Sequence, residues 1–259
     1  MRKVIYTCLT GAYDSLRQPS AVDGSFDYVC FSDSLPAGRD GLWEVRPMPS
    51  CIGPDGPELH GTRLSRYPKI LPHKVLPEYD ISVYMDANLR ITGKAFYDAV
   101  DAKIDSGCLI AQVPHLGADC VYDEVRRCHL MGKMSFSEAV AQKRYFKSLG
   151  FPRHVGMFEN NVIFRRHRDP SVISVSEAWW KEYMAHSRRD QLALAPVYHA
   201  FGLAPELLFG EGLNSRNVPF VEYSKHPGEL RLVSAKGLRR FPLKVLWTWR
   251  LWTGKIFLA

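Results

Sequence analysis

The chain has 259 residues, 46% of them hydrophobic, which suits one large α/β domain, or a domain with an appendage, around an ample core. No apolar run reaches the length of a membrane span and no signal-peptide stretch opens the sequence, so we expect a cytoplasmic protein. The formal net charge of +7 lies entirely beyond Glu229, where seven basic and no acidic residues occur, and the neutral remainder argues against a nucleic-acid-binding body.

The spacing of the cysteines does not indicate a disulfide framework. The six cysteines form no C-x-x-C pair, and Cys8 and Cys30 fall in apolar, strand-like runs. We therefore expect reduced and mostly buried thiols rather than disulfides or a zinc site.

The first part of the chain predicts short strands and one basic helix. Pro68 and Pro72 should break or kink that helix. The expected elements are, in order, strands at 3–9, 26–32 and around 43–45, a Pro- and Gly-rich loop at 47–61, a basic helical segment at 62–76 and a strand at 81–85.

The second part continues the alternation of helices and strands. Such alternation predicts an α/β fold with a mostly parallel sheet flanked by helices. The expected elements are a helix at 93–106, a strand at 108–113, an amphipathic helix at 135–149 closed by Gly150, a strand within 155–165, a helix at 176–186 and a further helix starting at 189–192.

Polar side chains follow three of the predicted strands at the point where each strand ends. These ends are Thr10–Asp14, Ser32–Asp33 and Asp86–Asn88. In sheets of this kind, ligands bind beyond the carboxyl ends of the strands. The sequence therefore predicts a single binding crevice at this edge.

The strand end at Asp86 and Asn88 has the composition of a metal site. Alternate residues of a strand point to the same side, so these two side chains should converge. Oxygen ligands suit Mn²⁺ or Mg²⁺, which usually bridge one or two carboxylates and a substrate diphosphate. A nucleotide-sugar transferase needs such an arrangement. The same two residues also serve in turns and as caps, so a structural role is the alternative.

Several motifs in order resemble a known family. They are VIYTCLTGAYD, FDYVCFSD, the basic helix with RYPKILPHK, YMDAN, GMFENNVIFRRH and RDQL, spanning about residues 3–205. Together they resemble the glycosyltransferase-like family long catalogued as a domain of unknown function in plant and bacterial chains. More distantly they are similar to retaining transferases of the glycogenin type, which have the GT-A fold. The resemblance implies a metal-dependent transferase that moves a sugar from a nucleotide sugar, with a UDP-sugar favoured.

The resemblance assigns the nucleotide to the first two strand ends. Thr7, Gly11 and Tyr13 would meet the nucleotide, and Asp33 matches the position that holds the uridine. A diphosphate also needs cations. One or two cations of the basic helix should contact it, and the candidates are Arg63, Arg66, Lys69 and Lys74.

The resemblance also suggests residues for the metal and the sugar. Asp86 and Asn88 stand at an aspartate-x-aspartate metal motif, in which Asn88 brings a neutral oxygen that should weaken metal binding. His226 is the candidate for a third metal ligand. Asp190 and Gln191 match a pair near the reacting carbon of the sugar; the alternatives for Asp190 are a helix cap or a salt-bridge partner of Arg188.

Other functions stay open at this point. Asn88 could mark a decayed metal site in a catalytically silent relative that binds nucleotide sugars or carbohydrate. A nucleotidyltransferase is a third possibility, but the turn T-G-A-Y-D lacks the glycine-rich, basic loop that grips a triphosphate. His115 and the stretch 122–124 could bind the acceptor or donor sugar, or Asp123 and Glu124 could simply open a helix.

The C-terminal end differs from the rest in composition. We divide the chain into a catalytic domain of residues 1–230 and a basic, aromatic tail of residues 231–259 with helical character. Tryptophans and cations in such a segment are typical of helices that lie on anionic membranes. We expect a peripheral attachment to the inner face of the cytoplasmic membrane and a glycan or lipid-linked acceptor, as in surface polysaccharide synthesis. The alternative is a terminal helix packed on the domain.

Overall fold

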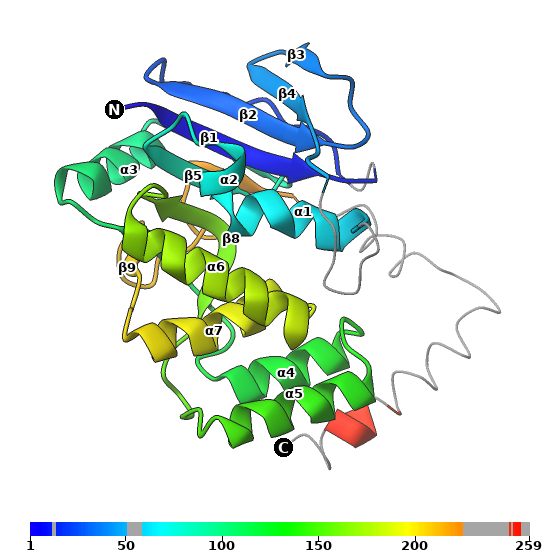
Figure 1. Ribbon diagram of the computed structural model, residues 1–259. Helices are drawn as coiled ribbons and strands as arrows, with labels where there is room; N and C mark the ends of the chain where they lie inside the picture. Colours follow the sequence, from blue (N-terminus) through cyan, green and yellow to red (C-terminus); the bar gives the residue numbers. More distant parts are fainter. Residues whose placement is uncertain (12–13, 51–58, 225–248, 250, 255–259) are drawn as a thin grey trace.

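The computed structural model describes residues 1–11, 14–50, 59–224, 249 and 251–254 (Figure 1). Their centre is an eight-stranded sheet in the order β3-β4-β2-β1-β5-β8-β7-β9, beside a small two-stranded sheet of β6 and β10. The strands are β1 (Lys3–Leu9), β2 (Phe26–Ser32), β3 (Gly38–Asp40), β4 (Trp43–Pro47), β5 (Ile81–Met85), β6 (Leu89–Ile91), β7 (Ile110–Pro114), β8 (Phe158–Arg165), β9 (Glu206–Leu207) and β10 (Val221–Tyr223).

The large sheet is mixed, with a parallel centre. Strands β4, β2, β1 and β5 run parallel to one another, whereas β8 is antiparallel to both β5 and β7. The prediction of a mostly parallel α/β sheet is therefore confirmed. Because β8 runs the opposite way, its first residues lie at the same edge as the last residues of β1, β2 and β5. Asp86, just after β5, donates its backbone N–H to the carbonyl of Asn161 at this edge (2.9 Å).

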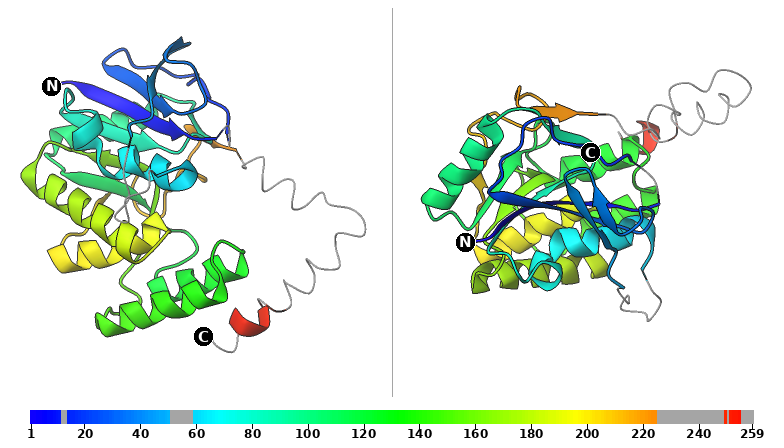
Figure 2. Two further views of the ribbon diagram at one scale, coloured as in Figure 1. Left: turned by 45° about the vertical axis from the view of Figure 1, so that its right-hand side comes forward. Right: turned by 90° about the horizontal axis from the view of Figure 1, so that it is seen from above.

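Helices flank the sheet along most of its length (Figure 2). The predicted basic helix is broken at Leu71 into α1 and α2, with Pro72 in the first turn of α2. The helix expected at 176–186 begins earlier, because Asp169 caps its start and Pro170 occupies its first turn, where proline fits. The helices are α1 (Gly61–Ile70), α2 (Pro72–Val75), α3 (Ala95–Asp105), α4 (Val121–Leu130), α5 (Phe136–Ser148), α6 (Pro170–Ala185) and α7 (Asp190–Phe201).

The alternation of side chains along the strands divides the core into two layers. Ile5 and Val83 belong to the layer under α3 and the β6–β10 sheet, whereas Tyr6 and Tyr84 belong to the layer under α1, α6 and α7. Asp86 follows Tyr84 by two residues, so it emerges on the side of α1 and α7. The strand period thus directs this carboxylate toward those helices.

Helices α4 and α5 form an antiparallel pair with a core of its own, set apart from the sheet (Figure 2). Ser135 and Glu138 make a reciprocal capping box at the start of α5. The last described turn of the chain, residues 251–254, packs on this pair: Thr253 is 3% exposed and its hydroxyl lies 2.8 Å from Nε2 of His129. Apart from Trp249, the rest of the predicted tail lies outside the described residues, as do Tyr13 and His226.

Five of the cysteines lie in the described part of the chain, and all five are buried, free thiols. This result confirms the expected burial of these five cysteines. Burial raises the pKa of Cys30 to about 12, so this thiol stays protonated near neutral pH. Among the described residues, no helix combines the length and apolar character needed to cross a membrane.

Candidate functional site

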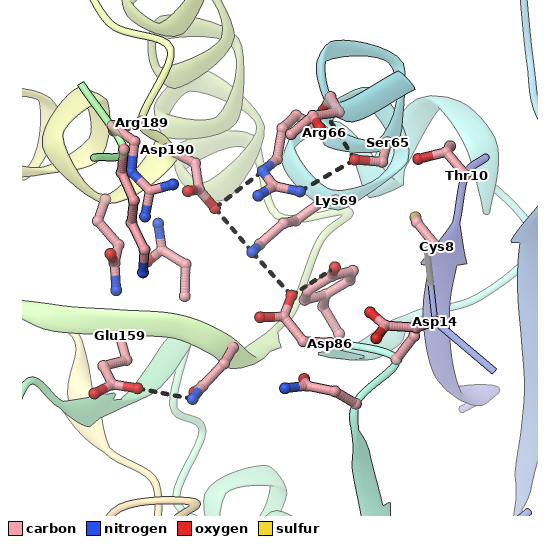
Figure 3. A pocket seen from close by; sticks show the side chains of 18 of the residues that line it. Cys8, Thr10, Asp14, Ser65, Arg66, Lys69, Asp86, Glu159, Arg189 and Asp190 are labelled. Atoms are coloured by element: carbon pink, nitrogen blue, oxygen red, sulfur yellow. Dashed lines mark hydrogen bonds and ion pairs between the residues drawn. The ribbon is translucent and has the colours of Figure 1, made fainter. Parts of the chain in front are cut away.

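A cleft of about 710 Å³ opens where β1 and β5 end and β8 begins. Its walls come from segments far apart in the sequence: the turn after β1, one face of α1, the start of α7, and the α4 region. Figure 3 shows the side chains converging on this space. The crevice predicted at the carboxyl edge of the sheet therefore exists, and the helices complete it.

A chain of charged side chains, buried at Lys69 and Asp190, crosses one wall of the cleft. Nζ of Lys69 lies 2.8 Å from Oδ2 of Asp190 and 3.2 Å from Oδ1 of Asp86 (Figure 3). Arg66 adds a guanidinium nitrogen 3.4 Å from the same oxygen of Asp190. Lys69 is only 2% exposed and Asp190 only 4%. The two predicted site carboxylates, from β5 and α7, are thus joined through one buried ammonium group.

Local structure explains how the two cations reach this position. Arg66 and Lys69 are three residues apart on α1 and therefore share one face of the helix. The end of α1 is held by Arg165 of β8, which is 2% exposed and donates to the carbonyl oxygens of Lys69 (2.6 Å) and Ile70 (3.3 Å). A buried arginine on the last carbonyls of a helix fixes its end, so Lys69 is positioned from both its backbone and its side chain.

Asp190 stands in the first turn of α7 and is fully ionised near neutral pH. Burial by itself would raise its pKa, but Lys69, Arg66 and Arg189 act against burial and hold the pKa well below its usual range. Trp179 of α6 fixes the backbone by donating its indole N–H to the carbonyl of Asp190 (3.0 Å). The carboxylate is therefore a fixed negative charge and not a proton donor at neutral pH.

The oxygens of Asp86 and Asn88 fit a divalent cation in kind. Both contacts of the Asp86 carboxylate, from Lys69 and from the hydroxyl of Tyr84 (2.9 Å), use Oδ1, and Figure 3 shows the second oxygen turned away from them. Asn88 donates its amide nitrogen to the carbonyl of Ser224 (2.8 Å) and also lines the cleft. A metal at Asp86 would share that carboxylate with Lys69. The predicted third ligand, His226, lies outside the described residues.

The opposite wall carries a second set of charges. Glu159 at the start of β8 is 3% exposed, pairs with Arg216 (2.7 Å) and accepts a hydrogen bond from the amide of Asn161 (2.8 Å). Glu124 of α4 lies 3.6 Å from Nε2 of His115. Burial lowers the pKa of His115, although Glu124 and Glu159 act in the opposite direction. The cleft thus presents carboxylates as well as cations to a ligand.

Two buried amide atoms at the start of β8 have no hydrogen-bond partner among the described residues. They are Nδ2 of Asn160 and Oδ1 of Asn161, and both residues line the cleft. Leaving such an atom unpaired costs about 1–3 kcal/mol. A ligand with hydroxyl groups would supply the missing partners.

The residues predicted to meet the nucleotide are only partly brought together. Gly11 lines the cleft, and its backbone N–H donates to Oδ1 of Asp33 (2.8 Å), so Asp33 holds the turn without lining the cleft itself. Thr7 is 2% exposed and, by strand alternation, faces away from the side on which Cys8 enters the cleft. Tyr13 lies outside the described residues.

Of the four basic residues predicted to contact a diphosphate, only two line the cleft. Arg66 and Lys69 line the cleft, which agrees with the expectation that one or two cations of this segment serve there. Arg63 instead points to α6, with a guanidinium nitrogen 3.9 Å from the sulfur of Met184. Lys74 pairs with Glu177 (2.8 Å). Arg63 is thus removed from the cleft because α1 turns it toward α6, and Lys74 because it lies beyond the break, on α2.

Sequence reasoning did not single out several residues that line the cleft. The sequence held a local indication for only some of them. The polar run Glu159–Asn161 interrupts an otherwise apolar strand, and Arg189 directly precedes the predicted pair at 190–191. Arg127 and Arg216 carried no local signal. The residues missed in this way are Arg127, Glu159, Asn160, Asn161, Arg189 and Arg216.

The chemistry of the cleft favours binding and stabilising charge over covalent attack by a thiol. Cys8 lines the cleft, but burial and the neighbouring Cys30 raise the pKa of its thiol far above neutrality. A thiol that stays protonated is a poor nucleophile. Fixed cations beside strand ends are, in contrast, suited to an anionic ligand such as a diphosphate.

Comparisons with known proteins place these features in a family context. Residues 57–210 match the family model described as TOD1/MUCI70, glycosyltransferase-like domain. A comparison with curated protein sequences gives no match.

Among solved structures, the chain is similar to mouse xyloside xylosyltransferase 1 in its apo form, with 10% identity, coverage of 78% of this chain and 83% of that chain, and a TM-score of 0.46. It is also similar to the galactosyltransferase LgtC in complex with donor and acceptor sugar analogs, with 13% identity, 95% coverage of each chain and a TM-score of 0.45. For the glycosyltransferase GlyE of Streptococcus pneumoniae TIGR4, the identity is 14%, the coverage is 99% of this chain and 62% of that chain, and the TM-score is 0.42.

Proposed function

Because the chain belongs to the TOD1/MUCI70 glycosyltransferase-like family, we propose that it transfers a sugar from a nucleotide sugar, with a UDP-sugar as the favoured donor, to a glycan or lipid-linked acceptor. The family resemblance predicted from the motifs is confirmed by this match. The observation that best supports the proposed reaction is the chain of charges Asp86–Lys69–Asp190, buried at Lys69 and Asp190, with Arg66 beside it, in a cleft at the strand ends.

The charge chain suits a reaction in which negative charge develops on a leaving nucleotide. Arg66 and Lys69 would contact the diphosphate and stabilise that charge, since preorganised charges in a water-poor site act strongly on a transition state. A divalent cation held by Asp86 and Asn88 would offset the same charge when bound. Lys69 provides a fixed positive charge beside the carboxylate of Asp86.

The start of α7 is the proposed place for the sugar. Gln191 follows Asp190 and lines the cleft beside it. An ionised Asp190 would stabilise positive charge that develops on the sugar ring, and the Gln191 amide would hold a sugar oxygen. The unpaired Oδ1 of Asn161 would accept from a hydroxyl group on the other side of the cleft.

Incubation with a panel of nucleotide sugars and Mn²⁺ tests the proposal. We expect hydrolysis above the protein-free rate for one class of donor, and stabilisation of the folded protein by about 2.7 kcal/mol when the free nucleotide is at 100 times its Kd. A catalytically silent relative would show the stabilisation without turnover. If no nucleotide sugar either stabilises the protein or is hydrolysed, the proposal is wrong.

The variant Gln191→Ala should separate turnover from binding. We expect kcat for donor hydrolysis to fall about 100-fold, because an amide that contacts the reacting sugar stabilises the transition state more than the ground state. The Kd for UDP should change less than about twofold. Gln18→Ala is the control, since it removes the same amide outside the cleft, where it contacts Asp40 and Leu42. An unchanged kcat with weakened donor binding would assign Gln191 to uniform binding instead.

Attachment to an anionic membrane through the basic tail remains a proposal. The described turn packs on α4 through Thr253, while Trp252 is 55% exposed. Most of the segment that carries the positive charge lies outside the described residues. A lipid-linked acceptor and a role in surface polysaccharide synthesis would fit such an attachment.

A further inference from the structure

A second cavity of about 230 Å³ adjoins the cleft and has a different character. It lies between α7 and the segment that leads into β8. Its wall is largely apolar and includes Phe151, Met157, Leu194, Ala195 and Leu203. A cavity with these walls favours an apolar ligand group, because such a group leaves water on entering it.

The cavity and the cleft share part of their lining through α7. Gln191 lines both spaces, and Leu194, Ala195 and Tyr198 follow it at intervals of three, four and seven residues. Residues with this spacing share one face of a helix. One face of α7 therefore carries the proposed sugar-contacting amide at one end and the apolar wall along the next two turns, about 10 Å further on.

Asn160 marks the junction from the side of β8. It also lines both spaces, and it is 2% exposed. Its Oδ1 accepts from Gln112 (2.8 Å), whose own oxygen accepts from the hydroxyl of Tyr198 (2.6 Å). This network fixes the amide of Asn160 and leaves its Nδ2 without a partner among the described residues. The junction thus offers a buried hydrogen-bond donor next to an apolar wall.

We propose that this cavity binds an aryl group of the acceptor, next to the hydroxyl that receives the sugar. The proposal rests on the proposed transferase function and names its acceptor class as an aryl glycoside. Size supports a single ring: an apolar cavity of about 150 Å³ binds benzene, so the larger volume here accommodates a ring with its linking atom. Asn160 would donate to the linking oxygen, and Gln191 would lie on the sugar side.

Ligand-observed saturation-transfer NMR with phenyl β-D-glucoside tests the inference directly. We expect saturation of the phenyl protons in the wild-type protein, and at least a tenfold weaker effect in Ala195→Leu, which fills the cavity from its wall. Ala200→Leu is the matched control, because Ala200 is exposed on the same helix outside the cavity and should leave the signal unchanged. Val155→Trp, at a side chain that is 50% exposed, fills the mouth of the cavity without entering the core and should also abolish the signal.

The outcomes distinguish this inference from the proposed function. UDP binding with Mn²⁺, measured by calorimetry on the same proteins, should be unchanged in all three variants. Absence of phenyl saturation in the wild-type protein, or its persistence in both filled variants, would overturn the aryl site while leaving the donor site intact. If the wild-type protein does not bind UDP in the presence of Mn²⁺, the transferase proposal is overturned instead.

Discussion

Asp190→Asn is expected to lower the free energy of unfolding by about 3–5 kcal/mol and to abolish turnover. The substitution keeps the shape of the side chain but removes the negative charge that faces Lys69 at 2.8 Å and Arg66 at 3.4 Å. Removing one partner of a buried ion pair leaves the other charge uncompensated, which is the costly case. Urea unfolding followed by tryptophan fluorescence measures the loss, and a fall in Tm of roughly 10 °C should accompany it.

A double-mutant cycle tests whether the ion pair is the cause. Lys69→Met removes the cation that Asp190 contacts and preserves most of its apolar stem. We expect the double variant to be more stable than the sum of the two single losses predicts, by about 1 kcal/mol or more, because the uncompensated charge is then gone. Additive losses would contradict the pairing as the source of the effect.

Asp190→Asn should also alter the dependence of the free energy of unfolding on pH. Because the folded-state pKa of Asp190 is lowered, its stabilisation is complete above the unfolded pKa of about 4 and is lost as the pH falls further. The difference in the free energy of unfolding between the wild-type protein and Asp190→Asn should therefore shrink below about pH 4. A difference that grows with acidity would mean that the carboxyl is stabilised in its neutral form.

Asp86→Ala is expected to weaken metal-dependent binding of UDP by about tenfold or more, which corresponds to at least about 1.4 kcal/mol. The substitution removes the cleft carboxylate that is the proposed metal ligand, whereas Lys69 keeps its partner in Asp190. The fold should consequently tolerate Asp86→Ala much better than Asp190→Asn. Calorimetry with UDP, with and without Mn²⁺, measures the effect.

Asp80→Ala is the matched control for this experiment. Asp80 precedes β5 as Asp86 follows it, and it contacts Arg2 and Arg168 at the opposite edge of the sheet. The change in charge is the same, so UDP binding should be unaffected. Asn88→Asp should retain or strengthen metal binding by adding a second carboxylate. Equal affinity of Asp86→Ala and the wild-type protein for UDP in the presence of Mn²⁺ would refute the assignment.

Local sequence patterns were sufficient to predict most strands of the sheet and the strand-end residues of the site. Apolar runs with abrupt polar ends predicted β1, β2 and β5, because a buried strand must end where its side chains can no longer be covered. Pro68 and Pro72 predicted the break at Leu71, since proline interrupts helical hydrogen bonding. The polar end of β5 likewise predicted that Asp86 lies just beyond this strand. The ordered motifs indicated the family resemblance.

Long-range contacts decided the remainder, because no local pattern encodes them. The antiparallel direction of β8 brings Glu159 and Asn160 to the strand ends, although these residues are more than 70 positions from Asp86 in sequence. The tertiary arrangement places the start of α7 within ion-pair distance of Arg66 and Lys69, and turns Arg63 toward α6. The sequence by itself determined which residue types and strand ends this protein brings to a site. Only the tertiary structure decided which charges are buried together, because burial and pairing depend on the neighbours that distant segments supply.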